Sequence, residues 1–220
     1  MKFRYLDLIT TAFAVVLLLS NIASTKIATL AGFEFDSGLI LFPLAYIFGD
    51  ILTEVYGYAR ARRVIWTGFA MNILMVVVFW VVGMFPPAAS WTNQEAYQTI
   101  LGVIPRIVLA SLTAYLVGEF LNSVILAKMK VKQNGKRFWQ RALSSTIIGQ
   151  LFDTTIFILI AFAGVLPWPV VFSIAWTNYV FKILIEIVML PLTYHIVGVL
   201  KKREGTDHYD HHTNFSPFAA

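Results

Sequence analysis

The chain has 220 residues, of which 58% are hydrophobic and only 13% are charged, and its formal net charge is +5. A soluble domain carries about 25% charged residues, so this composition excludes an ordinary soluble protein. Apolar runs of roughly 18 to 25 residues recur along the chain, which is the length that a helix needs to cross a bilayer. We therefore predict an all-α membrane protein, because the sequence lacks the short alternating segments of a membrane β-barrel.

Six transmembrane helices are expected. The first apolar run follows a short basic flank, as in a signal peptide, but the five spans behind it favour a first membrane helix. A shorter surface helix is expected before the fourth span, because Thr92 and Glu95 have the spacing of a capping box; it would end near Pro105, and a gate or lid is the alternative. The predicted spans are Tyr5–Ala23, Leu39–Tyr56, Val64–Met84, Ile104–Lys128, Leu143–Val165 and Val170–Leu200.

The basic residues alternate between the connections. Of the 17 lysines and arginines, 14 lie at the N-terminus, in the second and fourth connections and at the C-terminus. The positive-inside rule then places both termini in the cytoplasm. The basic charge thus reflects topology and does not indicate a nucleic-acid partner. We divide the chain into a transmembrane domain, residues 1–203, and a flexible cytoplasmic tail, residues 204–220, which lacks periodicity.

Polar stripes run along four of the predicted spans at similar depth. A charge near the bilayer centre costs about 3 kcal/mol on insertion scales, so each one needs a partner or a polar cavity. Four stripes together favour a functional cavity, with structural ion pairing as the alternative. The stripes are Phe42, Tyr46, Asp50 and Glu54; Ser111, Tyr115, Glu119 and Asn122; Thr146, Gln150, Asp153 and Thr154; and Asn178, Lys182 and Glu186, with Asn72 on the third span.

Three of these charges have simpler explanations close by in the sequence. Lys182 and Glu186 are one helical turn apart and could pair with each other. Glu54 is near the cytoplasmic end of its span, where Arg60 or another arginine of the next connection could claim it. Both alternatives remain open at the level of the sequence.

The remaining charges differ in how readily they can be explained. Lys26 and Arg106 lie near the outer surface, to which long basic side chains can extend. Asp50 and Asp153 have no basic residue within four positions and are the strongest candidates for function. A cavity with five acids and one deep lysine repels anions. It suits a cation, or a neutral ligand rich in N–H donors, and its carboxyl groups suit proton exchange.

Five segments resemble one known family. They are SNIASTKIATLAG, FPLAYIFGDILTEVYGYARARRVI, RIVLASLTAYLVGEFLN, SSTIIGQLFDTTIFILIAF and NYVFKILIEIVMLPLTY, which together extend from Ser20 to Tyr194. In order and spacing they resemble the bacterial queuosine precursor transporter family, also called the vitamin uptake transporter family. The resemblance implies import of 7-deazaguanine bases, such as 7-cyano- or 7-aminomethyl-7-deazaguanine, by a multi-pass protein of the bacterial cytoplasmic membrane.

The resemblance also implies functional positions. Two departures stand out: Asn122 replaces an aspartate that many members have, and Ala142 replaces an asparagine. The first puts in doubt an essential acid at that point of the fourth span. The positions that match the family pattern are Asn21, Lys26, Asp50, Glu54, Arg106, Gln150, Asp153 and Lys182.

Residue chemistry and resemblance together give the predicted site. A carboxylate can accept the adjacent N–H and amine of a deazaguanine through both of its oxygens, and the ring carbonyl needs a donor such as Lys182. For substrate binding we predict Asn21, Phe42, Tyr46, Asp50, Asn72, Glu119, Gln150, Asp153, Lys182 and Glu186. For transport or proton coupling we predict Lys26, Asp50, Glu54, Arg106 and Asp153.

Three classes of protein fit a small basic chain with six spans. The first is a carrier that works by alternating access, with proton coupling as an option. The second is the substrate-binding subunit of an energy-coupling-factor transporter, which needs a separate ATPase because this chain has no nucleotide-binding loop. The third, an intramembrane enzyme, is disfavoured because three of the four histidines lie in the tail. We predict a carrier that is not an enzyme, has no cofactor or metal, and forms a homodimer.

Overall fold

The computed structural model describes residues 3–30, 33–101, 104–164 and 167–218. Among these residues, six helices are long and apolar enough to cross a membrane, which confirms the predicted helical membrane fold. Large apolar side chains such as Trp80, Trp176 and Val188 point outward and are well exposed. A surface of this kind suits lipid, because the helices satisfy their own backbone groups and offer mainly apolar side chains to the bilayer.

The first connection differs from the expected loop. Helix α1, Leu6–Ala23, is followed by a two-stranded antiparallel hairpin of β1, Ile27–Leu30, and β2, Phe33–Asp36, with Ile27 opposite Asp36. A short 3₁₀ turn, η1, Ser37–Ile40, leads from the hairpin into the next helix. Four residues per strand are too few for alternation to stand out from the surrounding apolar sequence, so the pattern did not predict the hairpin.

Helices α2, Phe42–Tyr56, and α3, Tyr58–Met84, are separated by a single residue, Gly57. Its φ of +86° belongs to the region that favours glycine, so the chain reverses direction without a longer loop. Helix α3 therefore begins six residues before the predicted Val64, and the arginine cluster lies in its first turns rather than in a connection.

The second half of the chain contains three further spans and the expected surface helix. Helix α4, Gln94–Leu101, confirms the predicted short helix, and Tyr97 from it donates a hydrogen bond of 3.3 Å to the carbonyl of Phe79 on α3. The spans are α5, Ile104–Lys132, α6, Phe138–Phe162, and α7, Trp168–Glu204. Helices α5 and α6 form the most extensive helix–helix contact in the described residues.

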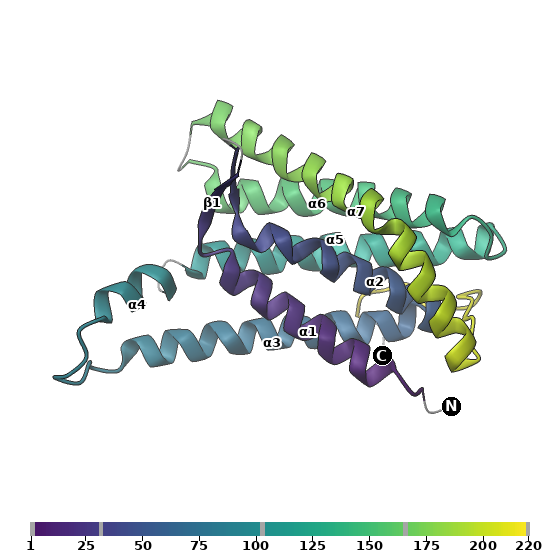
Figure 1. The fold of residues 1–220 in the computed structure, drawn as a ribbon, viewed down its shortest axis with the longest axis horizontal. Helices are drawn as coiled ribbons and strands as arrows, with labels where there is room; N and C mark the ends of the chain where they lie inside the picture. The colour runs from purple at the N-terminus through teal and green to yellow at the C-terminus, as the bar shows by residue number, and fades with distance from the viewer. Residues whose placement is uncertain (1–2, 31–32, 102–103, 165–166, 219–220) are drawn as a thin grey trace.

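Both termini lie at the same end of the bundle, as an even number of spans requires (Figure 1). We call this the termini end. The opposite end carries the hairpin and α4, and we call it the hairpin end (Figure 1). Helix α7 extends from the hairpin end to the termini end and contains Pro191 in its interior, where one backbone hydrogen bond is lost.

The C-terminal segment, residues 205–218, lies against the termini end of α3. The buried carboxylate of Asp210 accepts hydrogen bonds of 3.0 and 3.2 Å from the backbone N–H of Tyr58, where it caps α3. Arg62 donates to the carbonyls of Asn214 and Ser216, each at 2.9 Å. Sequence periodicity could not predict this packing, because single side chains rather than a repeating face make the contacts.

Candidate functional site

Four of the predicted acids come together inside the bundle, one from each of four spans. Asp50 lies on α2, Glu119 on α5, Asp153 on α6 and Glu186 on α7, and none is more than 2% exposed. Glu119 interacts electrostatically with Asp153 and Glu186, and Asp50 interacts with Glu119 and Glu186. We call these four residues the acid cluster. The structure thus brings one acid from each of the four stripes together.

Lys182 pairs with Asp153 and not with Glu186 of its own helix. Its ammonium group lies 2.7 Å from Asp153 Oδ2 and joins α7 to α6. The same ammonium lies 4.7 Å from the ring centroid of Phe42, close enough for a cation–π interaction. The pairing along α7 that the sequence left open is therefore absent from the described residues. Asp153, Lys182 and Phe42 form one mixed ionic and aromatic group.

Asp50 is held by the amide of Asn122. The Nδ2 group of Asn122 donates a hydrogen bond of 2.7 Å to Asp50 Oδ1, and both residues are fully buried. The departure from the family pattern at position 122 thus lies directly beside the strongest candidate acid. An asparagine here supplies a donor that an ionised aspartate lacks.

Many polar atoms around the acid cluster are buried without a protein partner. Buried polar atoms are almost always hydrogen-bonded, so a group of exceptions that converge marks a place completed by protons, water or a ligand. Most of these atoms are carboxylate or amide oxygens, which only accept, and the others are the hydroxyls of Tyr46, Tyr115, Thr146 and Thr154; a ligand that fits the oxygens therefore carries several N–H or O–H donors. They include Asp50 Oδ2, both carboxylate oxygens of Glu119, Asn122 Oδ1, Gln150 Oε1 and Glu186 Oε1.

Glycines bring the helix backbones close together beside the acid cluster. A Cβ atom added to Gly118 of α5 would lie 3.0 Å from the carbonyl of Gly149 on α6, and one added to Gly149 would lie 2.9 Å from the carbonyl of Gly118. The same atom on Gly118 would lie 2.7 Å from the Tyr46 hydroxyl and 2.8 Å from Asp153 Cβ. Small residues at this crossing allow close packing of α5 on α6 and leave room for the acids.

Replacement of Gly118 by alanine is therefore expected to destabilise the protein by about 1–3 kcal/mol, because the added methyl group overpacks the crossing. Gly198 on α7 offers a matched control, since a Cβ there has no neighbour within 4 Å. Thermal unfolding of the purified variants in detergent measures both. Equal unfolding midpoints for Gly118→Ala and Gly198→Ala would contradict the close approach.

Asn21 and Asn72, both predicted to bind substrate, occupy a network with Ser111 instead. The side-chain amide of Asn21 donates to Asn72 Oδ1, and the Ser111 hydroxyl donates to Asn21 Oδ1 at 3.0 Å. The amide of Asn72 in turn donates to the carbonyl of Gly68 at 2.9 Å. The network links α1, α3 and α5, so these side chains already have partners in the protein and act in helix packing.

Lys26 and Arg106 lie on the surface at the hairpin end. Lys26 is exposed, and the exposed Arg106 donates hydrogen bonds of 2.7 and 3.0 Å to the carbonyls of Ile160 and Ala163 at the end of α6. A cation at a helix C-terminus satisfies free carbonyls and complements the helix dipole. The structure thus places both residues on the surface at the hairpin end, away from the acid cluster.

Glu54 belongs to a separate, densely paired group near the termini end. The guanidinium of Arg141 on α6 donates to both Glu54 oxygens at 2.7 Å, and neither side chain is exposed. The ammonium groups of Lys201 on α7 and Lys130 on α5 complete the arrangement, with Lys130 3.6 Å from Glu54 Oε1. Arg60, the partner considered from the sequence, donates to the carbonyl of Tyr56 instead.

The C-terminal segment adds a second acid to this group. Asp207 pairs with Lys130 and lies 2.8 Å from Lys201, and Lys130 also donates to the carbonyls of Glu54 and His208, each at 2.6 Å. Partial burial favours the neutral form of Asp207, but the hydrogen bonds from the two lysines overcome it and hold its pKa below the usual value. This contribution is lost only as the pH falls below about 4.

We call Glu54, Lys130, Arg141, Lys201 and Asp207 the gate network. It joins the termini ends of α2, α5, α6 and α7 to the C-terminal segment. Sequence analysis assigned Lys130, Arg141 and Lys201 to connections or to the end of the chain, because the count of basic residues per loop reports topology and not pairing.

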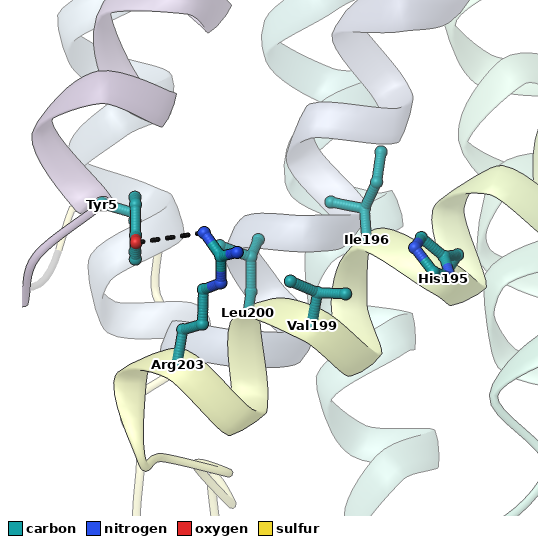
Figure 2. A pocket seen from close by; sticks show the side chains of 6 residues that line it. All are labelled: Tyr5, His195, Ile196, Val199, Leu200 and Arg203. Carbon is teal, nitrogen blue, oxygen red and sulfur yellow. Dashed lines mark hydrogen bonds between the residues drawn. The ribbon is translucent and has the colours of Figure 1, made fainter.

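A shallow groove of about 280 Å³ lies elsewhere, between the start of α1 and the last turns of α7 (Figure 2). Arg203 reaches across it to the Tyr5 hydroxyl, while Ile196, Val199 and Leu200 form its apolar wall (Figure 2). No member of the acid cluster lines this groove. We therefore place the candidate site at the acid cluster, where the unpartnered acceptors are.

Comparisons with known proteins agree on one family. Residues 36–196 match the family model described as "Putative vitamin uptake transporter". A probable queuosine precursor transporter of Bacillus subtilis is 32% identical over 176 residues, which cover 80% of this chain and 77% of the relative. The queuosine precursor transporter of Escherichia coli is 29% identical over 184 residues, 80% of this chain and 78% of the relative.

A third relative has the same described function. A probable queuosine precursor transporter of Haemophilus influenzae is 25% identical over 181 residues, which cover 79% of this chain and 73% of the relative. No solved structure matches the chain. The matched region includes α2, α5, α6 and α7 as far as Ile196, and these four spans carry the acid cluster.

Proposed function

The chain belongs to the vitamin uptake transporter family, and from this premise we propose that it imports queuosine precursors of the 7-deazaguanine class by alternating access. It is a multi-pass bacterial membrane protein and a transporter rather than an enzyme. The substrate is carried over from the names of the relatives. The acid cluster is the observation in this chain that supports it.

The chemistry of the acid cluster fits such a base. A 7-deazaguanine offers a ring N–H, an exocyclic amine and a pyrrole N–H, all of them donors, and one ring carbonyl that accepts. The unpartnered buried atoms are mainly carboxylate and amide oxygens. The ammonium of Lys182 can meet the carbonyl, and Phe42, whose ring centroid lies 4.7 Å from that ammonium, and the neighbouring Tyr46 supply aromatic surface for a flat ligand. An aminomethyl substituent would add a cation that a second acid can neutralise.

We extend the proposal to proton coupling. Four buried carboxyl groups share a single ammonium, that of Lys182. Uncompensated negative charge in the membrane interior is costly, so the cluster needs protons or the donors of a ligand to neutralise it. When the N–H donors of a substrate replace the protons on these carboxyl groups, substrate binding is coupled to proton movement.

The gate network supports alternating access. It closes the termini end below the acid cluster with buried ion pairs among four spans, and the positive-inside rule makes this the cytoplasmic end. Helix α7 carries Lys182 and Glu186 at the acid cluster and Lys201 at the gate network, with Pro191 between them. A helix weakened at a proline can bend there, so the two groups need not move as one rigid body.

Loosening the gate network is expected to expose the path between it and the acid cluster. Ser123 lies on α5 between Glu119 of the acid cluster and Lys130 of the gate network, fully buried and hydrogen-bonded by Thr53 at 3.1 Å, and the chain has no natural cysteine. In inside-out vesicles, a Ser123→Cys reporter should react with a membrane-impermeant maleimide roughly tenfold faster when Asp207→Asn is added, because charge-assisted hydrogen bonds to two lysines are lost.

Two controls make this result specific. Asp7 is exposed in the first turn of α1, so Asp7→Asn removes a charge at the same end and should leave the rate unchanged. Thr213→Cys should label from the cytoplasmic face only, which tests the orientation. Equal rates for Asp7→Asn and Asp207→Asn would argue against a gate at this network.

The proposed function is tested by uptake in liposomes. Purified protein is reconstituted, and accumulation of labelled 7-cyano- and 7-aminomethyl-7-deazaguanine is measured with and without an inward proton gradient. Saturable uptake that rises with the gradient is expected. Absence of both binding and uptake of these bases would refute the proposed substrate.

The same assay separates the carrier from the energy-coupling-factor alternative. A binding subunit of that kind would hold the base but transport it only together with an added ATPase and scaffold. Uptake by the chain alone supports the carrier. Co-purification of an ATPase from the native membrane, with uptake that depends on it, would support the alternative.

A further inference from the structure

One member of the acid cluster differs from the others in how its carboxylate is used. Both oxygens of Glu119 are buried and lack a hydrogen-bond partner in the protein. Asp153 is paired with Lys182, and Asp50 gives one oxygen to Asn122. Glu186 has a single unpartnered oxygen, Oε1. Among the buried acids of the described spans, Glu119 therefore has the only carboxylate of which both oxygens lack a hydrogen-bond partner.

The surroundings hold this carboxylate in place by packing. Gly49 of α2 presents bare backbone to it, so that a Cβ atom at that position would collide with Glu119 Oε1. The buried Tyr46 and Tyr115 lie within electrostatic range of Glu119, one on α2 and one a single turn away on α5. Packing of this kind fixes a side chain without using its hydrogen-bonding capacity, which is how a recognition group is held ready for a ligand.

We propose that Glu119 selects the substrate by its pyrimidine edge. Its two oxygens accept the ring N–H and the adjacent exocyclic amine of a guanine-type base in parallel. This assignment rests on the proposed function and deepens it by naming the residue that distinguishes 2-amino bases from bases without that amine. The two pairs Asp153–Lys182 and Asp50–Asn122 then contact the remaining polar groups of the base or carry protons.

The test compares two bases that differ at one group. We measure the dissociation constants of the purified full-length protein for 7-cyano-7-deazaguanine and for 7-cyano-7-deazahypoxanthine, which has hydrogen in place of the amine. The wild type should prefer the guanine-type base by at least about 100-fold, because its analogue leaves a buried carboxylate oxygen unpaired. This comparison needs no variant and stands even if a substitution prevents folding.

Glu119→Gln should then collapse the preference to less than about fivefold. Glutamine offers one acceptor and one donor, and this pair matches the N–H and carbonyl edge that both bases share. Glu186→Gln removes an acid from the same cluster and serves as the matched control, in which the preference for the amine should persist. Thermal unfolding of Glu119→Gln should be no easier than that of the wild type, since no protein hydrogen bond to the carboxylate is lost.

The outcomes separate the two levels of the proposal. If the wild type binds neither base, the proposed function fails. If it binds both equally well, or if Glu119→Gln keeps the full preference, the substrate class stands and the assignment to Glu119 is wrong. If Glu186→Gln collapses the preference and Glu119→Gln does not, the recognition group is Glu186.

Discussion

Replacement of Glu54 by glutamine is expected to lower the free energy of unfolding by about 3–5 kcal/mol. The substitution leaves Arg141 and Lys130, both at most 1% exposed, together with Lys201, with only Asp207 as an acid neighbour. Cations buried without their counter-charge are among the most costly defects in a protein interior. Thermal unfolding in detergent should show a drop of about 10 °C in the midpoint.

A second substitution shows how much of the lost stability is due to the unpaired cations and how much is due to lost packing. Adding Lys130→Met to Glu54→Gln removes one of the stranded cations and keeps the apolar stem, so part of the lost stability should return. Arg141→Gln alone should cost less than Glu54→Gln, because two lysines still face the carboxylate. If Glu54→Gln unfolded at the same temperature as the wild type, Glu54 would not be the centre of the network.

The spans could be predicted because the bilayer imposes a simple rule on sequence. Apolar runs of fixed length and basic residues on alternate connections are local properties, and both are visible without a partner helix. The ends of the helices were predicted less accurately than the spans themselves. Helix α3 begins at Tyr58 because one glycine completes the turn, and α7 continues to Glu204 through a basic stretch that composition alone assigns to a loop.

The candidate site could be predicted only as a set of stripes. Spacing places Asp50, Glu119, Asp153 and Glu186 on the inner faces of their helices, and the structure brings these four together. Pairing depends on how the helices are rotated and on their order in the bundle, which spacing does not contain. Lys182 thus faces α6 rather than its own helix.

Two further contacts were beyond prediction for the same reason. Glu54 is bonded by Arg141, which is 87 residues away in the chain. Asn21, which was chosen in part by resemblance to a family, donates its amide N–H to Asn72 Oδ1, and the amide of Asn72 donates to the carbonyl of Gly68. A polar residue inside a membrane bundle signals that a partner exists, and the sequence does not say whether that partner is protein or substrate.

Asp153→Asn is expected to reduce uptake of 7-cyano-7-deazaguanine by about 100-fold or more. The substitution leaves the ammonium of Lys182, which is 11% exposed, without its acid partner at 2.7 Å. Breaking one side of a buried ion pair costs about 3–5 kcal/mol, which is enough to displace the lysine or to favour an inactive arrangement of α6 and α7. Initial uptake rates in liposomes measure the loss, and thermal unfolding measures the cost to the fold.

The double variant Asp153→Asn/Lys182→Met decides whether this pair is structural or functional. Removal of both charges relieves the stranded ammonium, so the unfolding midpoint should return to within a few degrees of the wild type. Uptake should nevertheless stay below about 1% of the wild-type rate, because a methionine cannot donate to the carbonyl of the base and an amide cannot exchange a proton. Wild-type uptake by a stable double variant would instead show that Lys182 and Asp153 serve only to hold α6 against α7. Transport would then depend on the other three acids of the cluster, Asp50, Glu119 and Glu186.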